Sequence, residues 1–119
     1  MKNQTISPIV LEIVADMRNT RNKNCDMWES EGNDIVHEDW IHAMRSITVE
    51  EDIKDVIEVI SWSSNTGRMI QSLDDYKAYT LWEVYYDLHK DVHGVKARHT
   101  NWFDHDAKGW DEAIRDLNH

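Results

Sequence analysis

The sequence predicts an all-α fold, an irregular bundle of four to five helices forming one domain over residues 1–119. Apolar residues recur mostly at spacings of three and four, which is the period of an α-helix. Helix-capping patterns recur along the chain, and no segment alternates apolar and polar residues convincingly as a half-buried strand does. The four glycines and one proline mark no linker, and 119 residues suit one domain with its own core.

The first predicted helix begins at Ser7, which is followed by Pro8 at the first helical position, where proline is favoured. Its apolar stripe consists of Ile9, Val10, Ile13, Val14 and Met17. The polar run 19–24 predicts the end of this helix and a loop. Beyond that loop, Met27 and Trp28 are expected to anchor to the core.

A second helix is expected over 34–47, capped by Asp34. Its inward residues are expected to be Ile35, Val36, Trp40, Ile41 and Met44. Thr48 and Glu51 then form a capping box, in which each side chain binds the other residue's backbone N–H. In the helix that follows, the inward residues are Ile53, Val56, Ile57 and Ile60, and a loop is expected over 61–67.

A long helix is predicted over about 73–92, capped by Ser72 and stopped by Gly94. Its broad apolar face comprises Leu73, Tyr76, Leu81, Val84, Tyr85 and Leu88. Residues 95–103 are irregular in pattern, and a last helix fits 106–117. Its inward residues are Trp110, Ala113, Ile114 and Leu117.

The formal net charge is −10, and residues 31–60 contribute nine acidic and two basic side chains to it. This balance disfavours direct nucleic-acid binding, which depends on basic patches, and favours a partner with a basic surface. The candidate partner-binding residues are Glu38, Asp39, Glu50, Glu51, Asp52, Asp55 and Glu58. The alternative is a solvated helix face that serves solubility alone.

Histidines near the end of the fourth predicted helix are the weak candidates for metal ligands. His89 and His93 stand at i and i+4, so both can lie on one helix face, and His99 or His105 could complete a zinc site. No cysteine lies near, and Lys90 follows His89 where a zinc-protease helix has glutamate. The sequence therefore favours ordinary surface histidines, and we expect no metal and no stoichiometric zinc.

No catalytic constellation is recognisable, and the sequence predicts a protein that is not an enzyme and needs no cofactor. Cys25 has no adjacent basic residue to activate a thiolate, and a single cysteine allows no intrachain disulfide. The pair Ser63-Ser64 lacks the glycines of a hydrolase elbow. Acidic pairs such as Asp74-Asp75 fit the first turn of a helix.

Six tryptophans divide into two groups by position. Trp40, Trp82 and Trp110 fall on apolar helix faces and are expected in the core. The other three, in or beside predicted loops, are Trp28, Trp62 and Trp102. Each of these either serves as a binding hot spot or seals an edge of a small core, and the second role is the commoner one.

The segment 85–99 carries a motif: Tyr-x-x-Leu-x-Lys-Asp-Val-x-Gly, an apolar residue, and basic-x-Arg. It resembles a pattern in small bacteriophage-encoded proteins, in which a short acidic helix containing Trp-Asp follows, as Trp110-Asp111 does here. The resemblance covers roughly residues 76–117 and implies phage origin, but no activity. This chain has His93 where that pattern commonly has an aromatic residue and Ala97 where it has proline.

Two interpretations of this motif remain open. As a structural clamp, it caps the helix at Gly94, and Arg98 bridges back to Asp87 or Asp91. As a functional surface, it is a small basic patch in an acidic protein, able to bind an acidic partner. The residues of this second candidate patch are Lys90, Lys96, Arg98 and Trp102.

Together these features favour a phage-encoded inhibitor that binds a host protein through an acidic surface. The expected setting is the host cytoplasm. An anti-defence role, anti-CRISPR or anti-restriction, is expected because small, acidic, helical phage proteins usually act by binding host proteins. The expected target is a defence complex with a basic surface. One alternative is a phage accessory or structural protein, and another is a small zinc-binding module or metal-dependent enzyme. No membrane partner is expected, because Glu12 and Asp16 interrupt the N-terminal apolar stretch.

Overall fold

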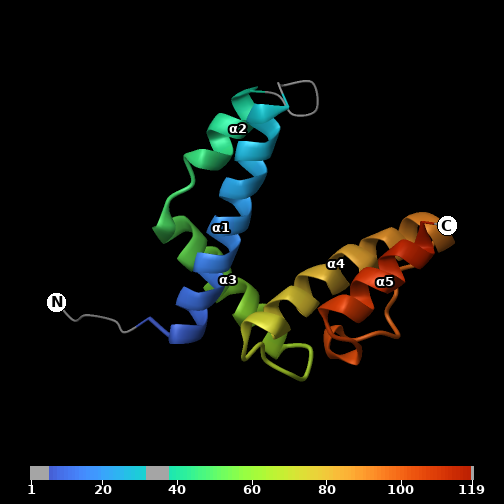
Figure 1. The fold of residues 1–119 in the computed structure, drawn as a ribbon. Helices are drawn as coiled ribbons and strands as arrows, with labels where there is room; N and C mark the ends of the chain where they lie inside the picture. Colours follow the sequence, from blue (N-terminus) through green and yellow to red (C-terminus); the bar gives the residue numbers. More distant parts are fainter. Residues whose placement is uncertain (1–5, 32–37, 119) are drawn as a thin grey trace. The chain divides into compact units, whose positions relative to one another are not determined.

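The computed structural model describes residues 6–31 and 38–118 and confirms the all-α fold. Five α-helices and one 3₁₀ helix follow one another in these residues, and no strand occurs among them (Figure 1). The chain forms two compact units, Met1–Glu58 and Val59–His119. The prediction of one domain therefore stays a prediction. No helix in the described ranges is long and apolar enough to cross a membrane.

Helix α1, Pro8–Ser30, begins as predicted: the Ser7 hydroxyl accepts a hydrogen bond from the Ile9 N–H at 3.3 Å. The predicted loop at 19–24 is wrong, because the helix continues through this run. The polar side chains there belong to a helix whose inner face carries Arg18, Arg21 and the fully buried Cys25. Their spacing of three and four residues is helical, although two of the three are charged.

The core of the first unit lies along α1, beside α2 (Glu38–Arg45) and α3 (Val49–Ser64). Its buried apolar residues are Val10, Ile13, Val14, Cys25, Ile41 and Val56. The prediction that Met27 anchors to the core is wrong, since its side chain is 48% exposed. Trp28, the other expected anchor, is half-buried. The predicted inward position of Ile57 is also wrong, since it is exposed.

Helix α2 is shorter than predicted and begins at Glu38. The expected cap Asp34 and the expected inward residues Ile35 and Val36 lie outside the described residues. The capping box of α3 is confirmed. The Glu51 carboxylate accepts a hydrogen bond from the Thr48 N–H at 2.7 Å, and the Thr48 hydroxyl accepts one from the Glu51 N–H at 3.1 Å.

The second unit is built on α4, Leu73–His93, which packs against α5, Ala107–Leu117, and against the 3₁₀ helix η1, Trp102–Asp104. The Ser72 hydroxyl caps α4 by accepting the Asp75 N–H at 3.0 Å. Gly94 ends the helix at φ +80°, the left-handed conformation that glycine adopts without strain. Both features were predicted.

Aromatic residues form the core of the second unit. Trp110 is buried as predicted, and its Nε1 donates to the Trp102 carbonyl at 2.7 Å. Trp82 is only half-buried, and its Nε1 donates to the Thr100 hydroxyl at 2.9 Å. Val84 is exposed, so its predicted inward position is wrong. The α4 face that packs inward instead carries Ala78 and Tyr79.

Candidate functional site

Six of the seven predicted partner-binding carboxylates are exposed. They lie on α2 and α3, whose buried residues Ile41 and Val56 fix which side of each helix faces inward. These six residues, called the acidic surface below, are Glu38, Asp39, Glu50, Glu51, Asp55 and Glu58. Lys54 is the one cationic side chain in the α3 segment, so exposed negative charge dominates there.

Asp52 does not belong to this surface, which corrects the sequence prediction. Its side chain is 1% exposed and accepts hydrogen bonds from Arg18 Nη1 at 2.8 Å and from both terminal nitrogens of Arg21, at 2.7 and 2.9 Å. A buried carboxylate needs such compensation, because removal from water strongly disfavours its charged form. Asp52 lies one helical turn before the buried Val56 and shares its inward face.

The same contacts shift the pKa values of the buried ions. Hydrogen bonds from Arg21, and to a smaller extent from Arg18, lower the pKa of Asp52 against the opposing effect of burial. The hydrogen bond to Asp52 raises the pKa of Arg21. Arg18 also donates to the Ile47 carbonyl at 3.0 Å, so this cluster holds the α2–α3 connection against α1.

Glu51 is exposed, but it has a structural role that limits its use as a binding residue. Its carboxylate closes the capping box on the Thr48 N–H. Glu50, Asp55 and Glu58 make no such contact within the described part of the chain. These three are therefore the carboxylates of α3 whose charge can be changed with the least effect on the fold.

Trp40 is exposed rather than buried, and sequence reasoning missed this. Its side chain is 54% exposed on α2, directly after Asp39. Trp40 and Ile41 are adjacent in the helix and so point about 100° apart. Because Ile41 takes the inward direction, Trp40 is turned outward. The sequence carries no signal that separates the two, because Met44 lies three residues after Ile41 and four after Trp40, and both spacings place residues on one helix face.

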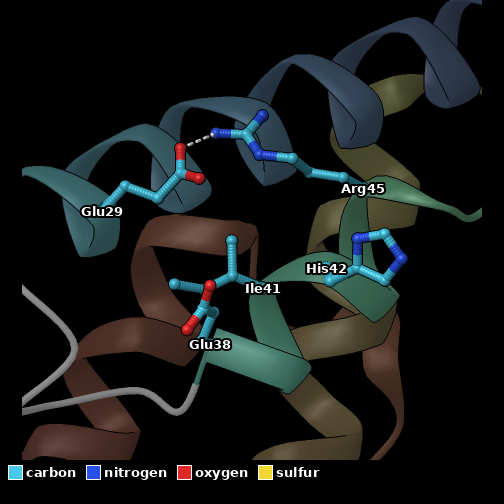
Figure 2. A pocket seen from close by; sticks show the side chains of 5 residues that line it. All are labelled: Glu29, Glu38, Ile41, His42 and Arg45. Atoms are coloured by element: carbon cyan, nitrogen blue, oxygen red, sulfur yellow. Dashed lines mark hydrogen bonds and ion pairs between the residues drawn. The ribbon is translucent and has the colours of Figure 1, made fainter.

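A polar pocket of about 320 Å³ lies between α1 and α2 and is shown in Figure 2. Its lining residues are Glu29, Glu38, Ile41, His42 and Arg45. Arg45 forms an ion pair across to Glu29, as Figure 2 shows, and another to Asp26 at 2.8 Å. The hydrogen bonds that Arg45 donates to these two carboxylates raise its pKa. Two of the charged side chains that line the pocket, Arg45 and Glu29, therefore pair with each other and join α2 to α1.

Three of the four residues predicted for the second candidate patch are exposed, and the fourth, Trp102, is buried. Lys90, Lys96 and Arg98 are exposed, and Lys90, Gly94, Val95, Lys96 and Arg98 line a pocket of about 420 Å³. Trp102 is 1% exposed, and its Nε1 donates to the Thr66 hydroxyl at 2.8 Å, so its assignment to a surface patch is wrong. Trp102 seals the core, whereas Trp62 is exposed.

Three of the four candidate histidines lie close together. The ring centroid of His89 is 4.6 Å from that of His93 and 5.8 Å from that of His99, whereas His105 packs edge-on against Trp110. His89 Nδ1 lies 2.7 Å from the Val95 carbonyl, to which it donates a hydrogen bond. Among the residues that the structure describes, no group of three or more His, Cys, Asp or Glu side chains could hold a metal ion.

Comparison with protein-family models, curated proteins and solved structures finds no significant match to this chain.

Proposed function

We propose that this protein is a non-catalytic inhibitor that binds a basic surface of a host protein through its acidic surface. The observation that supports the proposal most directly is the exposure of six carboxylates on α2 and α3. The motif over residues 85–98 adds the proposal that the inhibitor is phage-encoded. Small, acidic, helical phage proteins usually act by binding host proteins, so the proposed target is a host defence complex of the CRISPR or restriction type. Such complexes handle nucleic acid and therefore present basic grooves.

The three arginines described in the first unit do little to offset this charge. Arg18 and Arg21 contact the buried Asp52, and Arg45 pairs with Asp26 and Glu29 on α1. The carboxylates on the outer sides of α2 and α3 are left with Lys54 as the neighbouring cation along α3. A field of this kind attracts a basic partner and speeds association.

Trp40 gives the proposed interface an aromatic contact. Tryptophan is enriched among residues that contribute most to binding energy, and an arginine side chain stacks favourably on its ring. Arginine also pairs with carboxylates through two parallel hydrogen bonds. An exposed tryptophan beside Asp39 therefore suits an arginine-containing surface better than a purely lysine-containing one.

The experiment is affinity capture from bacterial lysate with three forms of the protein. The first is the natural chain, and the second carries Glu50→Lys, Asp55→Lys and Glu58→Lys. The matched control carries Asp91→Lys, Glu112→Lys and Asp116→Lys, which makes the same charge change at exposed positions of the second unit. Thr48, Glu51 and Asp52 are left unchanged because they stabilise the fold.

The proposal expects a host protein that the natural chain and the control retain at low salt and that the α3 variant does not. Circular dichroism must show that all three proteins have the same helix content. Equal retention by the α3 variant, or equal loss in the control, would show that the acidic surface is not the interface.

A further inference from the structure

A second surface, of opposite charge, lies where α4 ends. Lys90 is in the last turn of α4, and Lys96 and Arg98 follow its Gly94 cap. The three side chains line one pocket of about 420 Å³ with Gly94 and Val95, and no carboxylate lines it. This pocket, called the basic pocket below, belongs entirely to the second unit.

The cations of the basic pocket are set apart by their grouping. Arg18, Arg21, Arg45 and Arg115 all form ion pairs with carboxylates. Among the described residues, neither Lys90, Lys96 nor Arg98 forms one. The expected bridge from Arg98 to Asp87 or Asp91 is therefore wrong. Lys23, Lys54, Arg68 and Lys108 also form no ion pair among the described residues, but none of them lines this pocket. In a chain with 23 acidic and 13 basic side chains, three clustered cations without carboxylate partners are unexpected from composition.

The backbone holds these cations in place. The left-handed turn at Gly94 reverses the chain after α4, and the hydrogen bond from His89 Nδ1 to the Val95 carbonyl fixes the first residue beyond it. Ala97 is fully buried, whereas its neighbours Lys96 and Arg98 are exposed. Lys96 Nζ also lies 5.7 Å from the centroid of the Tyr86 ring, a cation–π contact.

The C-terminus of α4 does not explain the cluster by itself. A helix C-terminus carries about half a negative charge. Three full positive charges exceed this partial charge, and the exposed carboxylates Asp87 and Asp91 of the last two turns of α4 do not line the pocket, so an anion inside it faces cations. Binding would depend on the side chains, since the backbone carbonyls at this end of the helix repel anions.

We propose that the basic pocket binds a phosphate group, either as free phosphate or as the monoester of a small molecule. A phosphate carries close to two negative charges at neutral pH, and guanidinium and ammonium groups are its usual partners in proteins. Arg98 provides a planar pair of donors, and Lys90 and Lys96 provide point charges on either side of the Gly94 turn. This proposal uses no residue of the acidic surface, so it stands or fails independently of the proposed inhibitor function.

The test is a titration followed by ¹H–¹⁵N NMR, with the amides of Gly94 and Val95 as reporters. Sodium phosphate and methyl phosphate are added separately at constant ionic strength, with sodium chloride and sodium acetate as comparison anions. We expect saturable shifts with both phosphates and none with chloride or acetate. Saturation by inorganic phosphate alone would identify free phosphate as the ligand, and tighter binding of methyl phosphate would identify an ester.

Two variants with the same change of charge test the residues. Lys96→Gln with Arg98→Gln removes two cations of the basic pocket, and Lys108→Gln with Arg115→Gln removes two from α5. The first should weaken phosphate binding at least tenfold, whereas the second should leave it within about twofold of the natural chain. Their spectra report directly whether each variant is folded. Shifts that do not saturate, that acetate reproduces, or that both variants weaken equally would overturn the proposal.

Discussion

The Asp52 carboxylate on α3 binds Arg18 and Arg21 of α1. Arg18 also donates to the Ile47 carbonyl, which lies between α2 and α3, so the cluster joins three segments of the first unit. Asp52→Asn would leave two guanidinium groups facing a neutral amide in a buried position. Removing one partner of a buried ion pair typically costs about 3–5 kcal/mol, and the 30% exposure of Arg18 places this case near 3 kcal/mol.

The measurement is the free energy of unfolding by urea, with the exposed Glu58→Gln, which makes the same change of charge on α3, as the control. The control should differ from the natural chain by less than about 0.5 kcal/mol. Equal stability of the two variants would show that the Asp52 ion pairs do not hold the unit together.

The lowered pKa of Asp52 predicts a dependence of stability on pH. Because the pKa is lower in the folded protein than in the unfolded chain, the ionised carboxylate stabilises the fold above its ordinary pKa of about 3.9. This contribution is lost as the pH falls from there through the folded-state value. Between pH 5 and pH 2 the urea midpoint of the natural chain should therefore fall more steeply than that of Asp52→Asn. Parallel curves would contradict this assignment.

Sequence reasoning placed Asp52 on the surface because a carboxylate in an acidic stretch is usually solvated. The information that contradicts this lies 31 and 34 residues away, in Arg21 and Arg18. Arg18 lies directly before the polar run 19–24, which predicts a loop, and Arg21 lies within it. A helical stripe that includes charged residues is not recognised by a search for apolar periodicity.

At the level of elements, local chemistry predicted helix ends well. The caps at Ser7, Thr48 and Ser72 and the stop at Gly94 depend on neighbours within four residues, so the sequence contains all that determines them. The outward side of a helix depends on what packs against it. For that reason Trp40 was placed inward in error.

The left-handed conformation at Gly94 predicts the effects of two substitutions. Gly94→Ala should destabilise the protein by about 1 kcal/mol, because φ is +80° and a Cβ is unfavourable there. Nothing lies within 4 Å of the position a Cβ would take, so the cost comes from backbone conformation and not from a clash.

Gly94→Asn should cost less than Gly94→Ala, because asparagine tolerates this conformation better than other residues with a side chain. Thermal unfolding of both variants measures the difference. An asparagine variant less stable than the alanine variant would contradict the conformational explanation.

At the scale of the whole molecule, the chain divides into two units of about 60 residues, and α3 runs unbroken across the boundary after Glu58. Units of this size are only marginally stable alone. We expect a single cooperative transition, because loss of either unit removes the support of one half of α3. Calorimetry tests this expectation: the calorimetric and van't Hoff enthalpies should agree, and a calorimetric value about twice the van't Hoff value would show independent unfolding.

Charge is distributed unevenly over the two units. The exposed acids of α2 and α3 belong to the first unit, and the basic pocket belongs to the second. The count of charged residues predicted the acidic region and the motif over 85–99 predicted the basic one, apart from Asp52 and Trp102, which fold inward. It could not predict that Lys90, Lys96 and Arg98 lack carboxylate partners, because that depends on how the chain turns after α4.

The binding proposal is tested most directly by association kinetics with the captured host protein, at low and at moderate salt. The variant with Glu50→Lys, Asp55→Lys and Glu58→Lys is compared with the control that carries Asp91→Lys, Glu112→Lys and Asp116→Lys. We predict that the natural chain and the control associate rapidly at low salt and slow steeply as salt rises. The α3 variant should associate at least about tenfold more slowly at low salt, with little dependence on salt. A folded α3 variant with the natural association rate and salt dependence would contradict a role for the acidic surface.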